Sequence, residues 1–148
     1  KQKGFTLIEL LVVIAIIGIL STLAIIALNN ARQKARDARR LSDIKQIQTS
    51  LEIYNTDNGK YPANTATLGT LAAQCLGTGT AGFASLGTAA CGTSPYMAKV
   101  PNDPVSTQYY VYTSTGAVGA GYSLTFTTET QSQVGTAGAH TATEAGMQ

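Results

Sequence analysis

The chain contains little charge, few aromatic residues and few metal-binding residues. Only 12% of its 148 residues are Asp, Glu, Lys or Arg, about half of the fraction in an average soluble domain, and the formal net charge is +2. It has no Trp, one His and two Cys. This charge is too small for disorder driven by charge repulsion and argues against a strongly basic nucleic-acid-binding protein, so we expect no specific nucleic-acid partner. Two Cys are too few for a zinc ribbon or a ferredoxin.

Residues that could catalyse a reaction are also lacking. The sequence has no nucleophile–base–acid set, no glycine-rich loop that would hold a phosphate and no cluster of metal ligands. His140 stands alone, and we interpret it as an exposed polar residue. We therefore expect no enzymatic activity, no cofactor and no metal site.

What the sequence does have is a long apolar run near its start. Between Leu10 and Leu28 the only polar side chains are Ser21 and Thr22, whose hydroxyls can bond back to a helix. About 20 apolar residues are needed for a helix to cross the hydrocarbon layer of a membrane. A cleaved secretory signal is the alternative, but its apolar part is about 7–15 residues long and ends at a site such as A-x-A, which is absent here. Residues 5–28 are predicted to span a membrane or to be buried all round in an assembly.

Glu9 is an anomaly in this apolar segment. A carboxylate at the centre of a bilayer costs about 2.5–3.5 kcal/mol, and less near one end of the span. Glu9 can either reach the lipid headgroups, since it is near the helix start, or meet a positive partner. The nearest candidate partner is the amine that a cut before Phe5 would create.

The helical pattern continues past the apolar run. An apolar stripe at steps of three and four residues predicts an amphipathic helix over residues 29–58, and no proline interrupts it. We expect it to end at Asn58-Gly59, with Pro62 just beyond. The stripe consists of Ala31, Ala35, Ala38, Leu41, Ile44, Ile47, Leu51 and Tyr54.

Five of the ten basic residues lie between Arg32 and Arg40. The simpler interpretation is a solvated helix face, and the alternative is a surface for phosphate or acidic lipid headgroups. Counting charges by the positive-inside rule would place this cluster in the cytoplasm.

Residues 59–148 are predicted to form a small globular head. Residues 63–107 are expected to be mostly loop, with a short helix near 67–75. Segments 108–113 and 122–127 have the composition of two strands, and the glycines between them suit a hairpin, so residues 108–127 should pair. Tyr122, Leu124 and Phe126 would then face the helix stripe, and Val134 would belong to a third strand. The predicted fold class is α+β, with a long amino-terminal helix packed on a small antiparallel sheet.

The start of the sequence resembles type IV pilins and the pseudopilins of type II secretion. The resemblance is specific, because a Gly is followed by Phe, by a Glu four residues later and by an unbroken apolar helix. Matching segments are Lys3-Gly4-Phe5-Thr6-Leu7-Ile8-Glu9-Leu10-Leu11-Val12-Val13, then Tyr54-Asn55-Thr56-Asp57-Asn58-Gly59-Lys60-Tyr61-Pro62 at the helix exit, and more weakly Val100-Pro101-Asn102-Asp103-Pro104.

The resemblance implies a processing and assembly pathway. A membrane prepilin peptidase would cut between Gly4 and Phe5, which makes residues 1–4 part of a leader, and would methylate the Phe5 amine. Glu9 would pair with the Phe5 amine of a neighbouring subunit during assembly into a homopolymeric filament. An inner-membrane assembly platform and a separate ATPase would drive growth, and membrane lipid would surround the helix beforehand. The amino end would lie inside and the head outside.

Two departures from the family guide the choice within it. Many members carry a proline where Ile26 stands, so we expect a continuous helix here, with only Gly18 to weaken it. Major pseudopilins also resemble one another in an acidic calcium loop near the carboxyl end. Here the only acidic residues after Gly121 are Glu129 and Glu144. This favours the major subunit of an extracellular type IV pilus over the alternative, a major pseudopilin of type II secretion. A membrane-anchored binding protein that never polymerises is the alternative of another class.

The two cysteines are interpreted in the light of that orientation. Outside the cytoplasm, Cys75 and Cys91 would form a disulfide, which stabilises by about 3 kcal/mol on the loop-entropy estimate. The alternative, a metal site with two thiolates, lacks further ligands.

Overall fold

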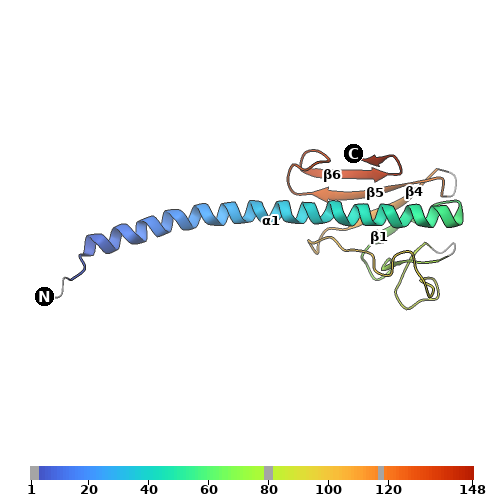
Figure 1. The fold of residues 1–148 in the computed structure, drawn as a ribbon, viewed down its shortest axis with the longest axis horizontal. Coiled ribbons are helices and arrows are strands. Elements are labelled where there is room, and N and C mark those ends of the chain that lie inside the picture. Colours follow the sequence, from blue (N-terminus) through green and yellow to red (C-terminus); the bar gives the residue numbers. More distant parts are fainter. Residues whose placement is uncertain (1–3, 79–81, 117–118) are drawn as a thin grey trace.

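One helix covers residues 7–58 of the computed structural model, which describes residues 4–78, 82–116 and 119–148. Helix α1 (Leu7–Asn58) has 52 residues and is about 78 Å long. It ends at Gly59, whose left-handed conformation (φ 68°) lets its N–H donate to the carbonyl of Asn55 over 2.8 Å. The head is packed along the second half of this helix, while the first half projects from it (Figure 1). The predicted uninterrupted helix is confirmed.

The head is built on a five-stranded antiparallel sheet. Its order is β1-β4-β5-β6-β7, so strands β4 to β7 form a meander and β1 pairs on the outer side of β4. A separate two-stranded sheet pairs β2 with β3. The strands are β1 (Ala66–Leu68), β2 (Cys75–Leu76), β3 (Phe83–Ala84), β4 (Tyr110–Thr115), β5 (Gly121–Thr128), β6 (Gly138–Thr143) and β7 (Gly146–Met147). Together with α1 they confirm the α+β class and the expected hairpin.

The core lies between α1 and the inner face of the sheet. In β5 the alternation places Tyr122, Leu124 and Phe126 in the core, as predicted. The helix stripe is buried only in part, because Ala31, Ala35 and Ala38 are exposed. The residues that α1 and strands β4 and β5 contribute to this core are Ile44, Ile47, Leu51, Tyr54, Tyr110, Tyr112, Tyr122, Leu124 and Phe126.

The prediction of a short helix near 67–75 is wrong. That segment contains β1, a turn and the start of β2, and the segment 63–107 as a whole holds three short strands. Gly69 makes the turn with φ 78°, and its N–H donates to the carbonyl of Ala73. The apolar segment around Leu68 is too short for its periodicity to distinguish a helix from a strand. It forms a strand because Leu68 pairs with Tyr110 of β4.

The carboxyl-terminal part also differs from the prediction. Val134 lies in a turn, and the third strand of the meander is β6, which contains His140. His140 is buried, with Nε2 2.8 Å from the carbonyl oxygen of Thr136 and 3.0 Å from Oγ1 of Thr128. β6 contains only Gly, Ala, Thr and His, so its alternating burial leaves almost no hydrophobic signal in the sequence.

Candidate functional site

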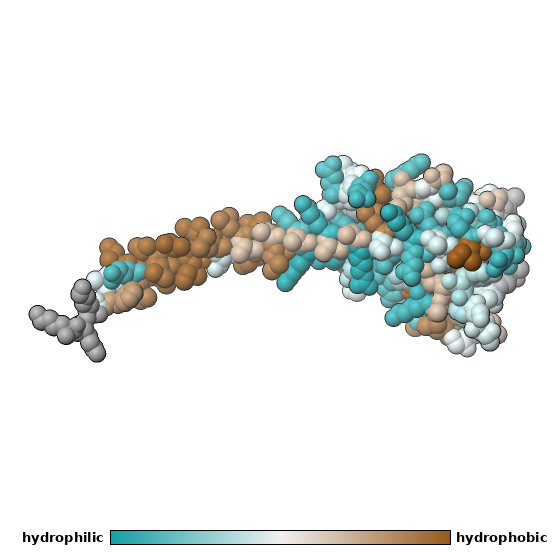
Figure 2. Space-filling model, in the orientation of Figure 1, coloured by the Kyte–Doolittle hydropathy of each residue, from teal (hydrophilic) through white to brown (hydrophobic). Residues whose placement is uncertain are grey.

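The first candidate site is the apolar half of α1. The large hydrophobic side chains from Phe5 to Leu28 are 46–83% exposed, because no other part of the described chain covers them. Figure 2 shows this rod as a mostly hydrophobic surface, and hydrophilic side chains begin on the helix just before it reaches the head. Among the described residues, α1 is the one helix long and apolar enough to cross a membrane. An exposed apolar surface of this extent marks a membrane or protein contact.

Thr6 and Glu9 form a capping box at the start of this rod. The Thr6 side chain accepts from the Glu9 N–H over 3.3 Å, while the Thr6 N–H and hydroxyl donate to Glu9 Oε2 over 2.8 and 2.7 Å. Two backbone N–H groups that lack helical partners are thereby satisfied. This role of Glu9 was missed at the level of sequence, although Thr-x-x-Glu is the pattern of a capping box.

The residues around the predicted cleavage point are accessible. Gly4 precedes the helix and is exposed, and a Cβ added to it would have no heavy atom within 4 Å. Phe5 is 83% exposed. The leader residues Lys1 and Lys3 lie outside the described residues. The peptide bond between Gly4 and Phe5 is therefore free of tertiary contacts within the described chain, as a protease substrate requires.

The position at which many relatives have a proline is regular helix here. α1 continues without a break through Gly18 and Ile26, and the Thr22 hydroxyl donates to the carbonyl of Ile19 over 2.8 Å. A Cβ added at Gly18 would meet nothing within 4 Å. The continuity expected from the sequence thus holds in the isolated subunit, and continuity in a filament stays a prediction.

The second candidate site is a cluster of ionised side chains where the head meets the helix. Arg40 is fully buried and donates to both carboxylate oxygens of Asp103 (2.7 and 2.9 Å), to Asp37 (2.7 Å) and to Glu129 (2.8 Å). It also donates to the side-chain oxygen of Gln108 over 3.1 Å. One guanidinium therefore joins α1 to the loop before β4 and to the turn after β5.

Two carboxylates of this cluster, those of Asp37 and Glu129, are held in their charged form. Hydrogen bonds from Arg36 and Arg40 outweigh the effect of burial and lower the pKa of Glu129 to about 2. Burial by itself would raise the pKa of Asp37. The hydrogen bonds that Asp37 accepts from Thr130, from the Glu129 N–H and from Arg40 outweigh burial, so its pKa is lowered. The cluster holds the head on the helix through ion pairs.

The basic segment 32–40 is therefore divided into two groups. Arg36 and Arg40 point into the head and pair with its carboxylates, so they do not belong to a solvated face. Arg32, Lys34 and Arg39 remain exposed, and Arg39 lies 3.7 Å from Asp43. The division is not visible in the sequence, because Asp103 and Glu129 are more than 60 residues away from Arg40.

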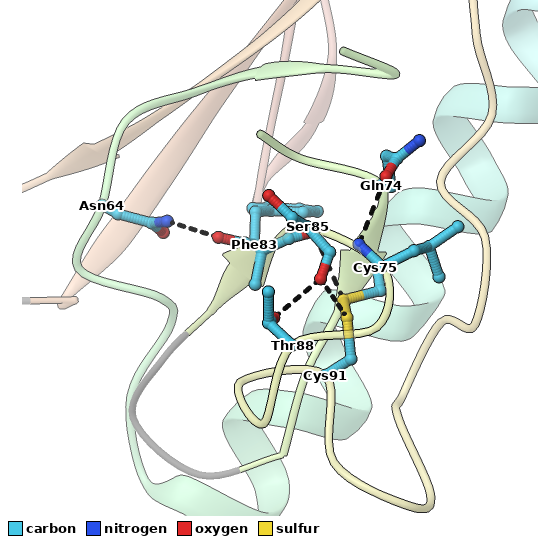
Figure 3. The surroundings of a disulfide bond; sticks show 9 residues. Asn64, Gln74, Cys75, Phe83, Ser85, Thr88 and Cys91 are labelled. Carbon is cyan, nitrogen blue, oxygen red and sulfur yellow. Dashed lines mark hydrogen bonds between the residues drawn. A yellow bond between two sulfur atoms is a disulfide. The ribbon is translucent and has the colours of Figure 1, made fainter. Parts of the chain in front are cut away.

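Cys75 and Cys91 form a disulfide bond in the structure, with their Cα atoms 6.0 Å apart. The bond ties β2 to the loop that follows β3 (Figure 3). Within that loop, the Thr88 hydroxyl donates to the carbonyl of Ser85 over 2.7 Å. Within the described ranges, no group of three or more His, Cys, Asp or Glu side chains could hold a metal ion.

Comparisons with family models give two matches that divide the chain near residue 26. Residues 27–144 match the model described as "Type II secretion system (T2SS), protein G". Residues 1–25 match the "Prokaryotic N-terminal methylation motif". No solved structure matches the chain.

Individual relatives carry the same description. The chain is 39% identical over 71 residues to the type II secretion system core protein G of Dickeya chrysanthemi, covering 48% of this chain and 46% of that protein. It is 44% identical over 62 residues to the Escherichia coli (strain K12) protein, covering 42% and 43%. It is 30% identical over 119 residues to the Vibrio cholerae protein, covering 80% and 75%. The chain thus spans less than half of the length of the first two relatives, and three quarters of the third.

Proposed function

Because this chain belongs to the type II secretion system protein G family, we propose that it is the structural subunit of a secretion pseudopilus, a helical filament of identical copies. At the level of sequence, the missing acidic calcium loop favoured an extracellular pilus. The relatives favour the alternative, a major pseudopilin, since all three carry the name type II secretion system core protein G. The filament would then grow from the inner membrane on the periplasmic side.

The exposed apolar rod carries this proposal. A rod about 33 Å long from Leu7 to Leu28 matches the hydrocarbon thickness of about 30 Å, so one subunit can be stored in a membrane. The same surface is long enough to pack against rods of other copies once it leaves the lipid. The head packs on the second half of α1 through a buried core and an ion cluster, so it can form the outer surface of the filament.

Glu9 has a defined place in this assembly step. Both bonds from Thr6 go to Glu9 Oε2, and no other described residue donates to Oε1, which can take a further donor. Glu9 can therefore cap its own helix with one oxygen and accept from the Phe5 amine of a neighbour with the other. Such a pair in a dry bundle sets the register between rods more than it adds stability.

Processing enters the proposal through the methylation motif. We expect a prepilin peptidase to cut between Gly4 and Phe5 and the Phe5 amine to be methylated. An assembly platform in the inner membrane and a separate ATPase would supply the work of extraction. The chain itself would have no catalytic role.

Amino-terminal sequencing and electron microscopy test the proposal together. The chain is produced in a host with its secretion machinery, the outer membrane is opened, and filaments recovered from the periplasmic side are imaged and their subunit identified. We expect filaments whose subunit begins with methyl-phenylalanine at position 5. A chain that stays intact before Phe5 and never leaves the membrane would show instead a single-pass anchored protein that does not polymerise.

A further inference from the structure

The structure has a groove on the flank of α1, at the end of the head nearest the apolar rod. One wall consists of Lys34, Ala38, Leu41 and Lys45, which are spaced three and four residues apart and so share one side of the helix. The turn 130–133 after β5 forms the other wall. The groove has a volume of about 460 Å³ and is open to the outside.

The groove carries positive charge that nothing in the described chain neutralises. Lys34 and Lys45 are exposed, and neither has a carboxylate within 4 Å among the described residues. Asp37, the one acidic residue of the lining, is 2% exposed and is already bound by Arg40 and the Thr130 backbone. The Ser132 hydroxyl and the Gln131 and Gln133 amides complete the wall, whereas the Thr130 hydroxyl already donates to Asp37. Such a set of groups fits the oxygens of a phosphate.

The height of the groove above the apolar rod indicates where that phosphate would come from. Lys34 follows Leu28 by six residues, which is about 9 Å along the helix. The headgroup layer of a bilayer extends about 5–8 Å beyond the hydrocarbon on each side. A lysine can lower its ammonium group along its flexible stem by several ångströms. The rod from Leu7 to Leu28 fills the hydrocarbon, so the amine of Lys34 reaches the plane of the lipid phosphates without any shift of the helix.

We propose that the Lys34 end of this groove binds the phosphate of an anionic phospholipid headgroup while the subunit is anchored in the membrane. The proposal rests on the membrane-anchored stage of the proposed function and not on polymerisation. The bound headgroup would fix the height and rotation of the head above the bilayer before the subunit is extracted. Leaving the lipid would expose the groove.

Native mass spectrometry of the full chain in detergent, with added phosphatidylglycerol or phosphatidylcholine, tests this. We expect the wild-type chain to retain phosphatidylglycerol in preference to phosphatidylcholine. Lys34→Gln with Lys45→Gln should lower the retention of phosphatidylglycerol about fivefold, since one basic residue near a lipid surface contributes about 1 kcal/mol. Lys34→Gln alone should account for nearly all of this loss, because Lys45 lies 17 residues past Leu28, about 25 Å along the helix and above the headgroup layer. Both side chains are exposed, so the thermal unfolding of the head should not change.

The matched control removes two other lysines. Lys60→Gln with Lys99→Gln deletes the same charge at positions that do not line the groove, and it should alter retention by less than twofold. An equal loss in this control, or equal retention of both lipids by the wild-type chain, would overturn the proposal.

A third arm separates lipid from soluble phosphate. If millimolar inorganic phosphate displaces phosphatidylglycerol in a Lys34-dependent way, the groove is a site for free phosphate and the lipid assignment is wrong. Filament formation by the wild-type chain is scored separately. Lipid selectivity without filaments would contradict the proposed function alone, and filaments without lipid selectivity would contradict this inference alone.

Discussion

The buried Arg40 gives the sharpest test of how the head is attached to the helix. Arg40→Met replaces the guanidinium with an apolar side chain of similar length and leaves Asp37, Asp103 and Glu129 facing one another. Arg36 still pairs with Glu129, so the lost hydrogen bonds affect the carboxylates of Asp103 and Asp37 most. We expect the variant to fold less stably without any change in the apolar rod.

The magnitude follows from what the substitution leaves behind. Arg40 makes five hydrogen bonds, four of them to carboxylates. Adding about 1.5–3 kcal/mol for each charged bond would overestimate the loss, because burying the guanidinium already cost desolvation energy on folding. Removing one partner of a buried ion pair typically costs about 3–5 kcal/mol. We therefore expect the free energy of unfolding to fall by about that amount.

Urea unfolding of the full chain in detergent, followed by tyrosine fluorescence, measures this loss. Seven Tyr and no Trp make tyrosine the natural probe, and several tyrosines lie in the core between helix and sheet. Arg39→Met is the matched control, since Arg39 is the preceding residue, its side chain is 62% exposed and it lies 3.7 Å from Asp43. An exposed pair contributes about 0–1 kcal/mol, so the control should change little.

Arg40→Lys separates charge from geometry. A lysine keeps the positive charge but cannot bridge Asp103 with two parallel bonds, so we expect a stability between wild type and Arg40→Met. If Arg40→Met and Arg39→Met lower the free energy of unfolding equally, or if neither lowers it by more than about 1 kcal/mol, the buried cluster does not hold the head on the helix.

Three further predictions concern assembly, the disulfide and pH. Glu9→Ala should leave membrane insertion intact and reduce the yield of filaments, and a normal yield would contradict the assembly role of Glu9. Replacing Cys75 and Cys91 together by Ser should lower the free energy of unfolding by about 3 kcal/mol; two free sulfhydryls in a thiol titration of the wild-type protein would refute the pairing. The pKa of Glu129 is lowered from 4.5 to about 2 in the fold, so its contribution to stability is complete above pH 4.5 and is lost as the pH falls towards 2. Acid titration of unfolding in Glu129→Gln should lack that part of the pH dependence, and an unchanged profile would refute it.

The long helix was predictable because its signals are local. Apolar residues without interruption, a stripe with helical spacing and Gly59 at the end all act within a few residues of one another. The hairpin was predictable for a similar reason, since β5 alternates apolar and polar side chains. Strands β1 and β6 were missed, because β1 has only three residues and β6 contains only Gly, Ala, Thr and His, so both depend on pairing with β4 and β5.

The same division applies to the candidate sites. The apolar rod, Gly4, Phe5 and Glu9 could be identified from the first ten residues and the run that follows. The basic segment could be seen but not interpreted, since only the fold shows that Arg36 and Arg40 face carboxylates while Lys34 faces a groove. The capping box of Thr6 and Glu9 was present in the sequence pattern and was overlooked.

By itself, the sequence determined that this protein has an apolar helical anchor joined to an α+β head, because hydrophobicity and helical periodicity are properties of neighbouring residues. Only the tertiary structure decided which charges are buried and which remain on the surface. That decision depends on Asp103 and Glu129, which reach Arg40 across more than 60 residues of chain once the sheet has formed. Three close carboxylates offset the cost of burying the Arg40 guanidinium inside the head, while Lys34 and Lys45 stay exposed with no ion pair among the described residues.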